Sequence, residues 1–246
     1  MKTLIGILVA ILLSGNIAAQ EEDKLQLTLS TKIWSQYVLN SGVVFHEGPV
    51  VQTDAFLTLP KGFYLDFWWS AGLNDARPSS NFGDEIDYTA GWSGEIGKKL
   101  VLDIGVAYFD LWPLFETGGD GNVVKPYAKL SRTFEVGKKH ELTPLLAIEY
   151  HHPLKDMPSG AYTWTGLKDV WTVTKLLSLS QEAGVLYDSG AYDSQKTFVG
   201  YGAWEANWQV TKRFSIQLPS IRLAVPVNNS DRKTEFTYAA GGTIKF

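Results

Sequence analysis

The chain contains no cysteine among its 246 residues, which excludes a disulfide framework and cysteine-ligated metal centres. After Gln20 it also lacks the run of roughly 18 apolar residues that a transmembrane helix requires. Its formal net charge of −4 is small, so the composition does not indicate a nucleic-acid partner. If the mature chain lies in a membrane, it must therefore cross as a closed β-sheet.

The N-terminus has the features of a targeting segment. Lys2 supplies a positive charge, and a short apolar run follows from Leu4 to Leu13. Small residues come next, which places the expected cleavage after Ala19. The sequence therefore predicts a signal peptide over residues 1–19 and a single mature domain over residues 20–246.

The clearest structural pattern extends from Gly83 to Trp112. Apolar and polar residues alternate along two stretches that are joined by the turn Gly97-Lys98-Lys99. Because side chains alternate across a strand, each stretch has one apolar face and one polar or small face. Each stretch is also about long enough to cross a bilayer as a tilted strand, roughly 9–11 residues. The pattern predicts a transmembrane β-hairpin.

Twelve stretches of this kind occur between Leu25 and Phe246. They are connected alternately by short turns that carry Lys or Arg and by longer loops rich in Gly, Asn, Asp, Ser and Pro. This alternation is typical of outer-membrane barrels, which have an even number of strands. The predicted fold is therefore all-β: a transmembrane up-and-down antiparallel β-barrel of about 12 strands.

Three predicted strands have features that bear on the barrel interior. The first strand is expected from Leu25 to Leu39, with a loop over Asn40–Pro49 after it. In the eighth strand, the apolar parity slips near Lys168–Asp169, which suggests a β-bulge. In the eleventh strand, the parity switches at Pro219–Ser220, where proline cannot donate to a ladder, so a second bulge is expected.

The final stretch from Tyr238 to Phe246 resembles the terminal strand of Gram-negative outer-membrane proteins, with apolar residues at alternate positions before a last aromatic residue. This resemblance implies a location in the outer membrane of a Gram-negative bacterium. It also implies contact with outer-membrane lipid and lipopolysaccharide, and recognition of the strand ending at Phe246 by the outer-membrane assembly machinery.

Three short motifs resemble the TorF-like porins, a proteobacterial family with poorly defined function, over most of the mature chain. They are Ser35-Gln36-Tyr37-Val38, the stretch Gly83–Tyr88 with Gly91-Trp92, and Val106-Ala107-Tyr108-Phe109. The first motif departs from the family's usual form, because Leu39-Asn40-Ser41-Gly42 stands where an Arg-Gly pair follows in the family. The resemblance supplies no functional residues.

Strand parity places a set of charged residues on the inner face of the barrel. The predicted lumen-lining residues are Lys32, Asp54, Asp66, Glu85, Asp87, Asp103, Lys125, Lys129, Glu149, Glu205, Arg222, Glu235 and Lys245. Acidic residues dominate the second to fifth strands, and basic residues dominate the opposite side, so the lumen is expected to have an acidic and a basic wall. Such walls filter permeating solutes. Alternatively, the charges pair and plug the interior, since twelve strands lie between a filled and a water-filled barrel.

The remaining chemistry-bearing residues form no motif for catalysis or cofactor binding. Glu149 and His151 share a face, which admits a metal or acid–base pair, although solvated loop-edge residues have the same pattern. Trp34 and Trp68 point inward, whereas most tryptophans fit an aromatic girdle. No enzyme activity, metal ligand or cofactor is predicted.

The composition and pattern favour a porin-like channel for passive diffusion of small polar solutes or ions. The alternatives are a closed structural or surface-binding barrel that acts through its loops, and a membrane-embedded lipid hydrolase. A secreted β-sandwich or lipocalin-like barrel would need a cover over its outer apolar band, and the sequence offers none.

Overall fold

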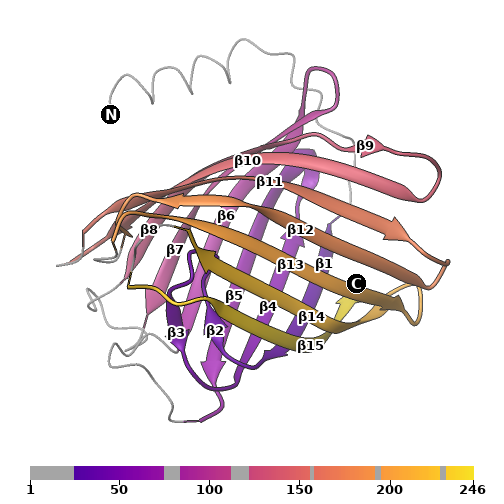
Figure 1. Ribbon diagram of the computed structural model, residues 1–246. Helices are drawn as coiled ribbons and strands as arrows, with labels where there is room; N and C mark the ends of the chain where they lie inside the picture. Colours follow the sequence, from indigo (N-terminus) through magenta and orange to yellow (C-terminus); the bar gives the residue numbers. More distant parts are fainter. Residues whose placement is uncertain (1–24, 75–83, 112–121, 156–157, 192–194, 228–230) are drawn as a thin grey trace.

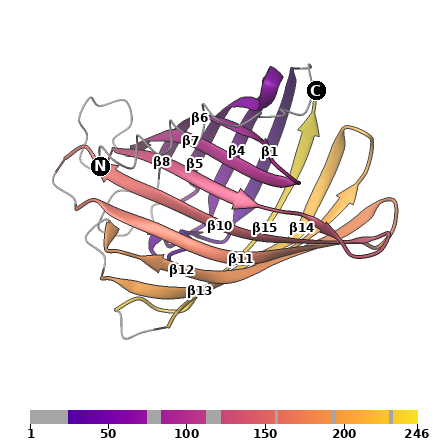
Figure 2. The ribbon, with the colours of Figure 1, turned by 90° about the horizontal axis from the view of Figure 1, so that it is seen from above.

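The computed structural model describes residues 25–74, 84–111, 122–155, 158–191, 195–227 and 231–246, and these form one closed antiparallel barrel (Figures 1 and 2). The barrel closes because β1 pairs with β15 and β10 pairs with β11. Twelve long strands make the wall, as predicted. They are β1 (Gln26–Trp34), β4 (Val50–Thr58), β5 (Phe63–Gly72), β6 (Glu85–Ile96), β7 (Leu100–Leu111), β8 (Val123–Ser131), β10 (His140–Pro153), β11 (Gly160–Thr172), β12 (Leu177–Asp188), β13 (Thr197–Gln209), β14 (Phe214–Pro226) and β15 (Glu235–Lys245).

The alternation of side chains produces an apolar outer surface. On β5, Leu65, Phe67 and Trp69 are between 40% and 48% exposed on the outside, whereas Tyr64 and Ser70 face inward and are buried. Trp171, Trp204 and Trp208 are exposed in the same way on other strands. Among the described residues, no helix is long and apolar enough to cross a membrane.

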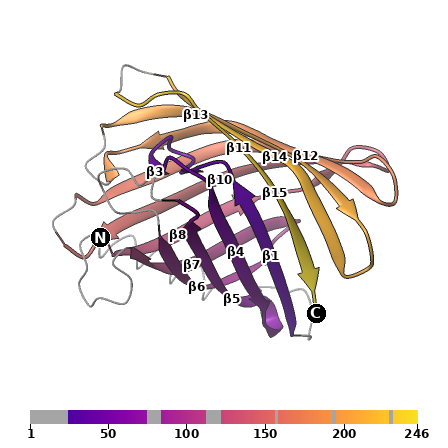
Figure 3. The ribbon, with the colours of Figure 1, turned by 90° about the horizontal axis from the view of Figure 1, so that it is seen from below.

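The connections form two classes, and each class occupies one end of the barrel. Short turns follow β4, β6, β8, β11 and β13, and we call this the short-turn end. The first of these turns contains the 3₁₀ segment η1 (Pro60–Gly62), in which Lys61 and Gly62 have positive φ. The C-terminus lies at the short-turn end (Figure 3), where the Phe246 amide donates to the Leu27 carbonyl over 2.9 Å. The other connections define the long-loop end.

The first predicted strand is too long at its C-terminal end. β1 ends at Trp34, and residues 35–49 turn into the barrel instead of extending the wall or forming a surface loop. Within them β2 (Tyr37–Val38) pairs with β3 (Val44–His46) in a separate small sheet. The views from the side and from below place this hairpin inside the barrel outline (Figures 1 and 3). We call residues 35–49 the in-turned hairpin.

The predicted bulge at Lys168–Asp169 is wrong. The register of β11 against both neighbours is continuous across this point. Lys168 faces the lumen, and Asp169 lies on the outer face with Leu167 and Trp171, which explains the apparent slip in parity. The bulge expected at Pro219–Ser220 is confirmed, because the β14 register shifts between Gln217 and Ser220.

The sixth predicted strand is also interrupted. Alternation in the sequence predicts one strand over residues 124–135, whereas β8 ends at Ser131 and a separate two-residue strand, β9 (Phe134–Glu135), pairs with the start of β10. The connection after β8 is therefore longer than the other short turns. This difference lies at the rim and does not change the inward face of β8.

Candidate functional site in the barrel lumen

The in-turned hairpin fills part of the lumen at the long-loop end. Phe45 is 3% exposed and packs edge-on against Tyr37, with ring centroids 5.1 Å apart. Tyr37 also packs on Trp68 of β5 at 5.6 Å, and its hydroxyl donates to Glu85 Oε2 over 2.7 Å. The hairpin is therefore attached to the wall by aromatic packing and by a buried hydrogen bond.

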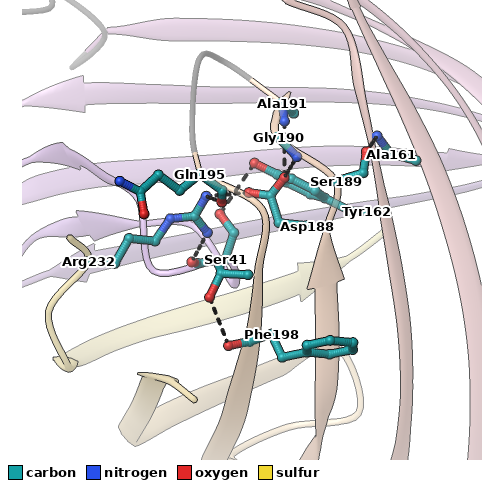
Figure 4. A network of polar contacts seen from close by, with 11 residues as sticks. Ser41, Ala161, Tyr162, Asp188, Ser189, Gly190, Ala191, Gln195, Phe198 and Arg232 are labelled. Carbon is teal, nitrogen blue, oxygen red and sulfur yellow. Dashed lines mark hydrogen bonds and ion pairs between the residues drawn. The ribbon is translucent and has the colours of Figure 1, made fainter. Parts of the chain in front are cut away.

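A second attachment holds the tip of the hairpin to the loops above it (Figure 4). Arg232, between β14 and β15, donates through Nη1 to the Ser41 carbonyl over 2.7 Å. Its Nη2 forms an ion pair with Asp188 at the end of β12. Asp188 Oδ1 in turn accepts from the amides of Gly190 and Ala191 over 2.8 and 3.0 Å. We call the Arg232–Asp188–Ser41 contacts the latch, because they join three connections at the long-loop end.

Three cavities lie along the inner wall. The central cavity, of about 350 Å³, lies under the hairpin and is lined by Tyr37, Trp68, Asp66, Glu85, Asp87 and Lys125 among others. A lateral cavity of about 140 Å³ includes Glu182, Tyr201 and Glu235. A lower cavity of about 270 Å³ includes Lys32, Lys168 and Glu205. Arg222 lines all three cavities.

The acidic side of the lumen is formed by β4, β5 and β6. Asp54 and Asp66 lie diagonally across the β4–β5 pair, and Asp87 lies diagonally across the β5–β6 pair from Asp66. Glu85 is 1% exposed and is held by the Tyr37 hydroxyl. Four carboxylates thus gather on one wall of the lumen.

The basic side is partly neutralised by acidic residues of other strands. Lys32 forms an ion pair with Glu205, which also accepts from Ser220 Oγ over 2.7 Å. Lys125 Nζ lies 3.5 Å from Glu149 Oε1, and His151 Nε2 lies 3.2 Å from the other oxygen of Glu149. The lumen therefore does not contain a simple acidic wall facing a simple basic wall.

Arg222 has a different environment from these lysines. Its guanidinium carbon lies 4.3 Å from the centroid of the Trp34 ring, and Lys32 lies on the same ring at 5.9 Å. In the described part of the chain Arg222 forms no ion pair, and neither do Asp54, Asp66, Asp87 or Lys168. These five side chains face the lumen without an ion pair, although Lys125 lies near Asp66 and Asp87 in the central cavity and Asp54 and Asp66 interact with each other.

The remaining predicted lumen residues lie nearer to the short-turn end or the rim. Asp103 and Lys129 are cross-strand neighbours on β7 and β8, and Asp103 Oδ1 accepts from the Tyr64 hydroxyl over 2.7 Å. Glu235 accepts from Gln36 Nε2 over 3.0 Å. Lys245 pairs with Thr28 in the β1–β15 ladder and is exposed at the short-turn end.

The short-turn half of the lumen keeps its aromatic rings against the wall. Tyr64 and Tyr127 hydrogen-bond to each other. The Tyr64 hydroxyl lies 2.4 Å from the position that a Cβ would take at Gly91, and the Tyr127 hydroxyl 2.5 Å from that position at Gly105. Because glycine has no Cβ, the rings lie flat where any other residue would push them into the lumen.

Several lumen residues were not predicted from the sequence. Lys168 and Glu182 line the lower cavity, Trp164 and His151 line the central cavity, and Asp188 and Arg232 form the latch. Strict period-two counting through Lys168–Asp169 would have found Lys168, and the same counting along β12 places Glu182 on the inner face. His151 is not a solvated loop-edge residue, because it is 3% exposed inside the barrel. Neither the latch nor the in-turned hairpin has a local sequence pattern.

Two features bear on the alternative of a membrane-embedded hydrolase or a metal site. Ser159 Oγ lies 2.9 Å from His152 Nδ1 at the exposed long-loop rim. In a hydrolytic triad Nδ1 is the nitrogen that the orienting carboxylate holds, so this pair has the wrong polarity. No group of three or more His, Asp or Glu side chains suited to a metal ion occurs in the part of the chain that the structure describes.

A closed antiparallel barrel with an apolar outer surface and a charged interior is the architecture of bacterial outer-membrane β-barrels. Residues 18–145, more than half of the sequence, match a family described as bacterial proteins of unknown function (Gcw_chp), and the chain belongs to that family. No curated protein matches the sequence.

Solved structures support the same architecture. The NanC porin aligns with a TM-score of 0.59 and 11% identity, over 89% of this chain and 100% of that one. The KdgM porin aligns with a TM-score of 0.57 and 12% identity, over 89% and 99%. The translocator domain of the autotransporter NalP from Neisseria meningitidis aligns with a TM-score of 0.60 and 11% identity, over 99% and 95%. At these identities the likeness shows the fold alone. The finer resemblance to TorF-like porins stays a prediction.

Proposed function

We propose that this chain is a porin-like channel through which small polar solutes and ions diffuse passively across the outer membrane. The observation that carries the proposal is the set of lumen charges without ion pairs, namely Asp54, Asp66, Asp87, Lys168 and Arg222. A charge inside a narrow barrel must be paired or hydrated. These side chains therefore require water in the lumen, and a hydrated lumen admits small polar solutes.

The arrangement of the cavities favours an open path through the lumen rather than a plugged interior. The central and lower cavities both reach Arg222, one beneath the hairpin and the other toward the short-turn end. In the short-turn half, Tyr64 and Tyr127 lie close to glycines of the wall, which keeps these rings out of the centre of the lumen. The in-turned hairpin narrows the path and does not fill it, because the central cavity of about 350 Å³ lies beneath it.

The charge of the lumen argues against acidic oligosaccharides as solutes. One solved neighbour is a KdgM porin in complex with disordered oligogalacturonate, which is a chain of carboxylates. Here Asp54, Asp66, Glu85 and Asp87 gather on the wall of β4, β5 and β6. Carboxylates at this wall would repel a polyanion, so we propose small solutes that are neutral, cationic or dipolar.

Planar-bilayer recording of the refolded mature chain tests the proposal. Stepwise conductance with a reversal potential that favours cations in a salt gradient is expected. The matched control is the same preparation denatured before addition, which must give no steps. Folded, inserted protein that gives no conductance would overturn the channel function and direct attention to the long loops.

Export and membrane assembly of the chain also follow from its sequence features. Residues 1–24 lie outside the described residues, and we propose that residues 1–19 are the signal peptide that exports the chain. We propose that the short turns face the periplasm, where the assembly machinery recognises the strand ending at Phe246, and that lipid and lipopolysaccharide surround the apolar surface. Deleting Phe246 in cells should lower the amount of barrel in the outer membrane, whereas deleting Lys98 should not.

A further inference from the structure

We infer that the central cavity is a transit site for small zwitterions, with the ammonium group at Asp66 and Asp87 and the carboxylate at Arg222. The inference rests on the proposed channel function and names the solute class that the channel favours. It follows from the presence, in one cavity, of two carboxylates and one guanidinium that form no ion pair.

Two carboxylate oxygens of the acidic wall have no hydrogen-bond donor in the part of the chain that the structure describes, and the ammonium of Lys125 in the same cavity is paired with Glu149. Oδ1 of Asp66 and Oδ1 of Asp87 have no hydrogen-bond partner among the described residues, although both side chains line the central cavity. Glu85 between them and the hairpin already accepts from Tyr37. A primary ammonium offers three N–H donors and a positive charge. It can therefore donate to the free oxygens of both aspartates and neutralise their charge. A trimethylammonium group offers the charge without the donors.

Arg222 supplies the complementary group. Its guanidinium carbon lies 4.3 Å from the centroid of the Trp34 ring, and no ion pair among the described residues includes Arg222. A planar guanidinium with five donors binds a carboxylate in a bidentate manner. The nearest competing carboxylates are engaged, because Glu205 pairs with Lys32 and Glu182 accepts from the Tyr201 hydroxyl over 3.2 Å.

The geometry of the lumen favours a solute that carries both charges. An anion is repelled by the carboxylates of β5 and β6, and a cation is repelled by Arg222, which lines all three cavities. A zwitterion is attracted at both walls and has no net charge to move across the narrow region. The central cavity, at about 350 Å³, is large enough for an amino acid or a short peptide.

Swelling of liposomes that contain the refolded mature chain tests the inference. The probes are γ-aminobutyrate, its N-acetyl derivative, which is an anion, and its trimethylammonium analogue, with arabinose as the neutral reference. We expect γ-aminobutyrate to enter about two- to fivefold faster than either analogue relative to arabinose, which is the size expected for solvent-exposed charge contacts. A series of ω-amino acids of rising length should show an optimum that measures the span from Asp87 to Arg222.

Two variants and a control connect the preference to this site. Arg222→Gln and Asp87→Asn should each remove the preference for γ-aminobutyrate while arabinose still enters. Lys245→Gln, at the exposed short-turn end, should keep it. Equal entry of all charged probes, or a preference that survives Arg222→Gln, overturns this inference. Absence of swelling with arabinose in the unmodified protein overturns the channel function itself, so the two failures are distinguishable.

Discussion

The two halves of the barrel lumen differ in how their side chains are held. In the long-loop half, the in-turned hairpin buries Trp34, Tyr37, Phe45 and Val50 in one apolar cluster, and Tyr162 and Leu186 belong to a second. In the short-turn half, inward side chains are mostly small, polar or charged, and most are at least partly exposed, with Tyr64, Ser215 and Gln217 as buried exceptions. The long-loop half is thus the narrow, packed region, and the short-turn half is the wider, hydrated one. Selectivity is expected at the inner edge of the long-loop half, where Arg222 lies.

Removing the in-turned hairpin should have the largest effect. Replacing residues 37–46 by a short Gly-Ser linker removes Tyr37, Phe45 and the attachment to Glu85. Because the hairpin occupies cross-section in the narrow half, single-channel conductance should rise by roughly twofold or more. A change of Lys98 and Lys99 to serine, at the other end, serves as the control. Unchanged conductance after removal of the hairpin would show that the narrow region lies elsewhere.

Opening the latch should have the next largest effect. Arg232→Gln removes the ion pair with Asp188. The Arg232 side chain is 10% exposed and the Asp188 side chain 0%. Breaking one partner of a buried pair costs about 3–5 kcal/mol, so the hairpin should become mobile and the conductance should fluctuate between levels. The measurement is the noise of single-channel records together with protease cleavage between Leu39 and Val43. Arg213→Gln, in a short turn, should leave both readouts unchanged.

The barrel and most of its inner face could be predicted from the sequence, because period-two alternation is a local property of each strand. That counting gave the correct faces for Asp54, Asp66, Asp87 and Arg222. It failed at Asp169, an outward charge that imitates a slip of parity. The ion pairs Lys32–Glu205 and Arg232–Asp188 join residues far apart in the chain. Their formation depends on barrel closure, which no local pattern encodes.

Neutralising charges in the narrow half should change ion selectivity moderately. The double variant Asp66→Asn/Asp87→Asn should lower the preference for cations, because it removes two carboxylates without ion pairs from the lining of the central cavity. Lys129→Gln should have a smaller effect of opposite sign, since Lys129 lies beside Asp103 in the wider half. Reversal potentials in a salt gradient measure both changes. If Lys129→Gln shifts the reversal potential as much as the double aspartate variant does, the selective region is not confined to the long-loop half.

The smallest effect on transport is expected from Asp169, which tests the assignment of inner and outer faces. On the outer surface its carboxylate accepts from Trp171 Nε1 and Gln181 Nε2, each over 2.9 Å, and contacts the His140 ring. Asp169→Ala leaves these polar groups without their acceptor, and each lost hydrogen bond costs about 1 kcal/mol. The melting temperature should therefore fall, while conductance and reversal potential stay unchanged. Lys168→Gln is the matched comparison, because its side chain faces the lower cavity and should change selectivity with little loss of stability. If Asp169→Ala shifts the reversal potential instead, β11 presents the opposite face to the lumen, and the charge pattern of the narrow half must be reassigned.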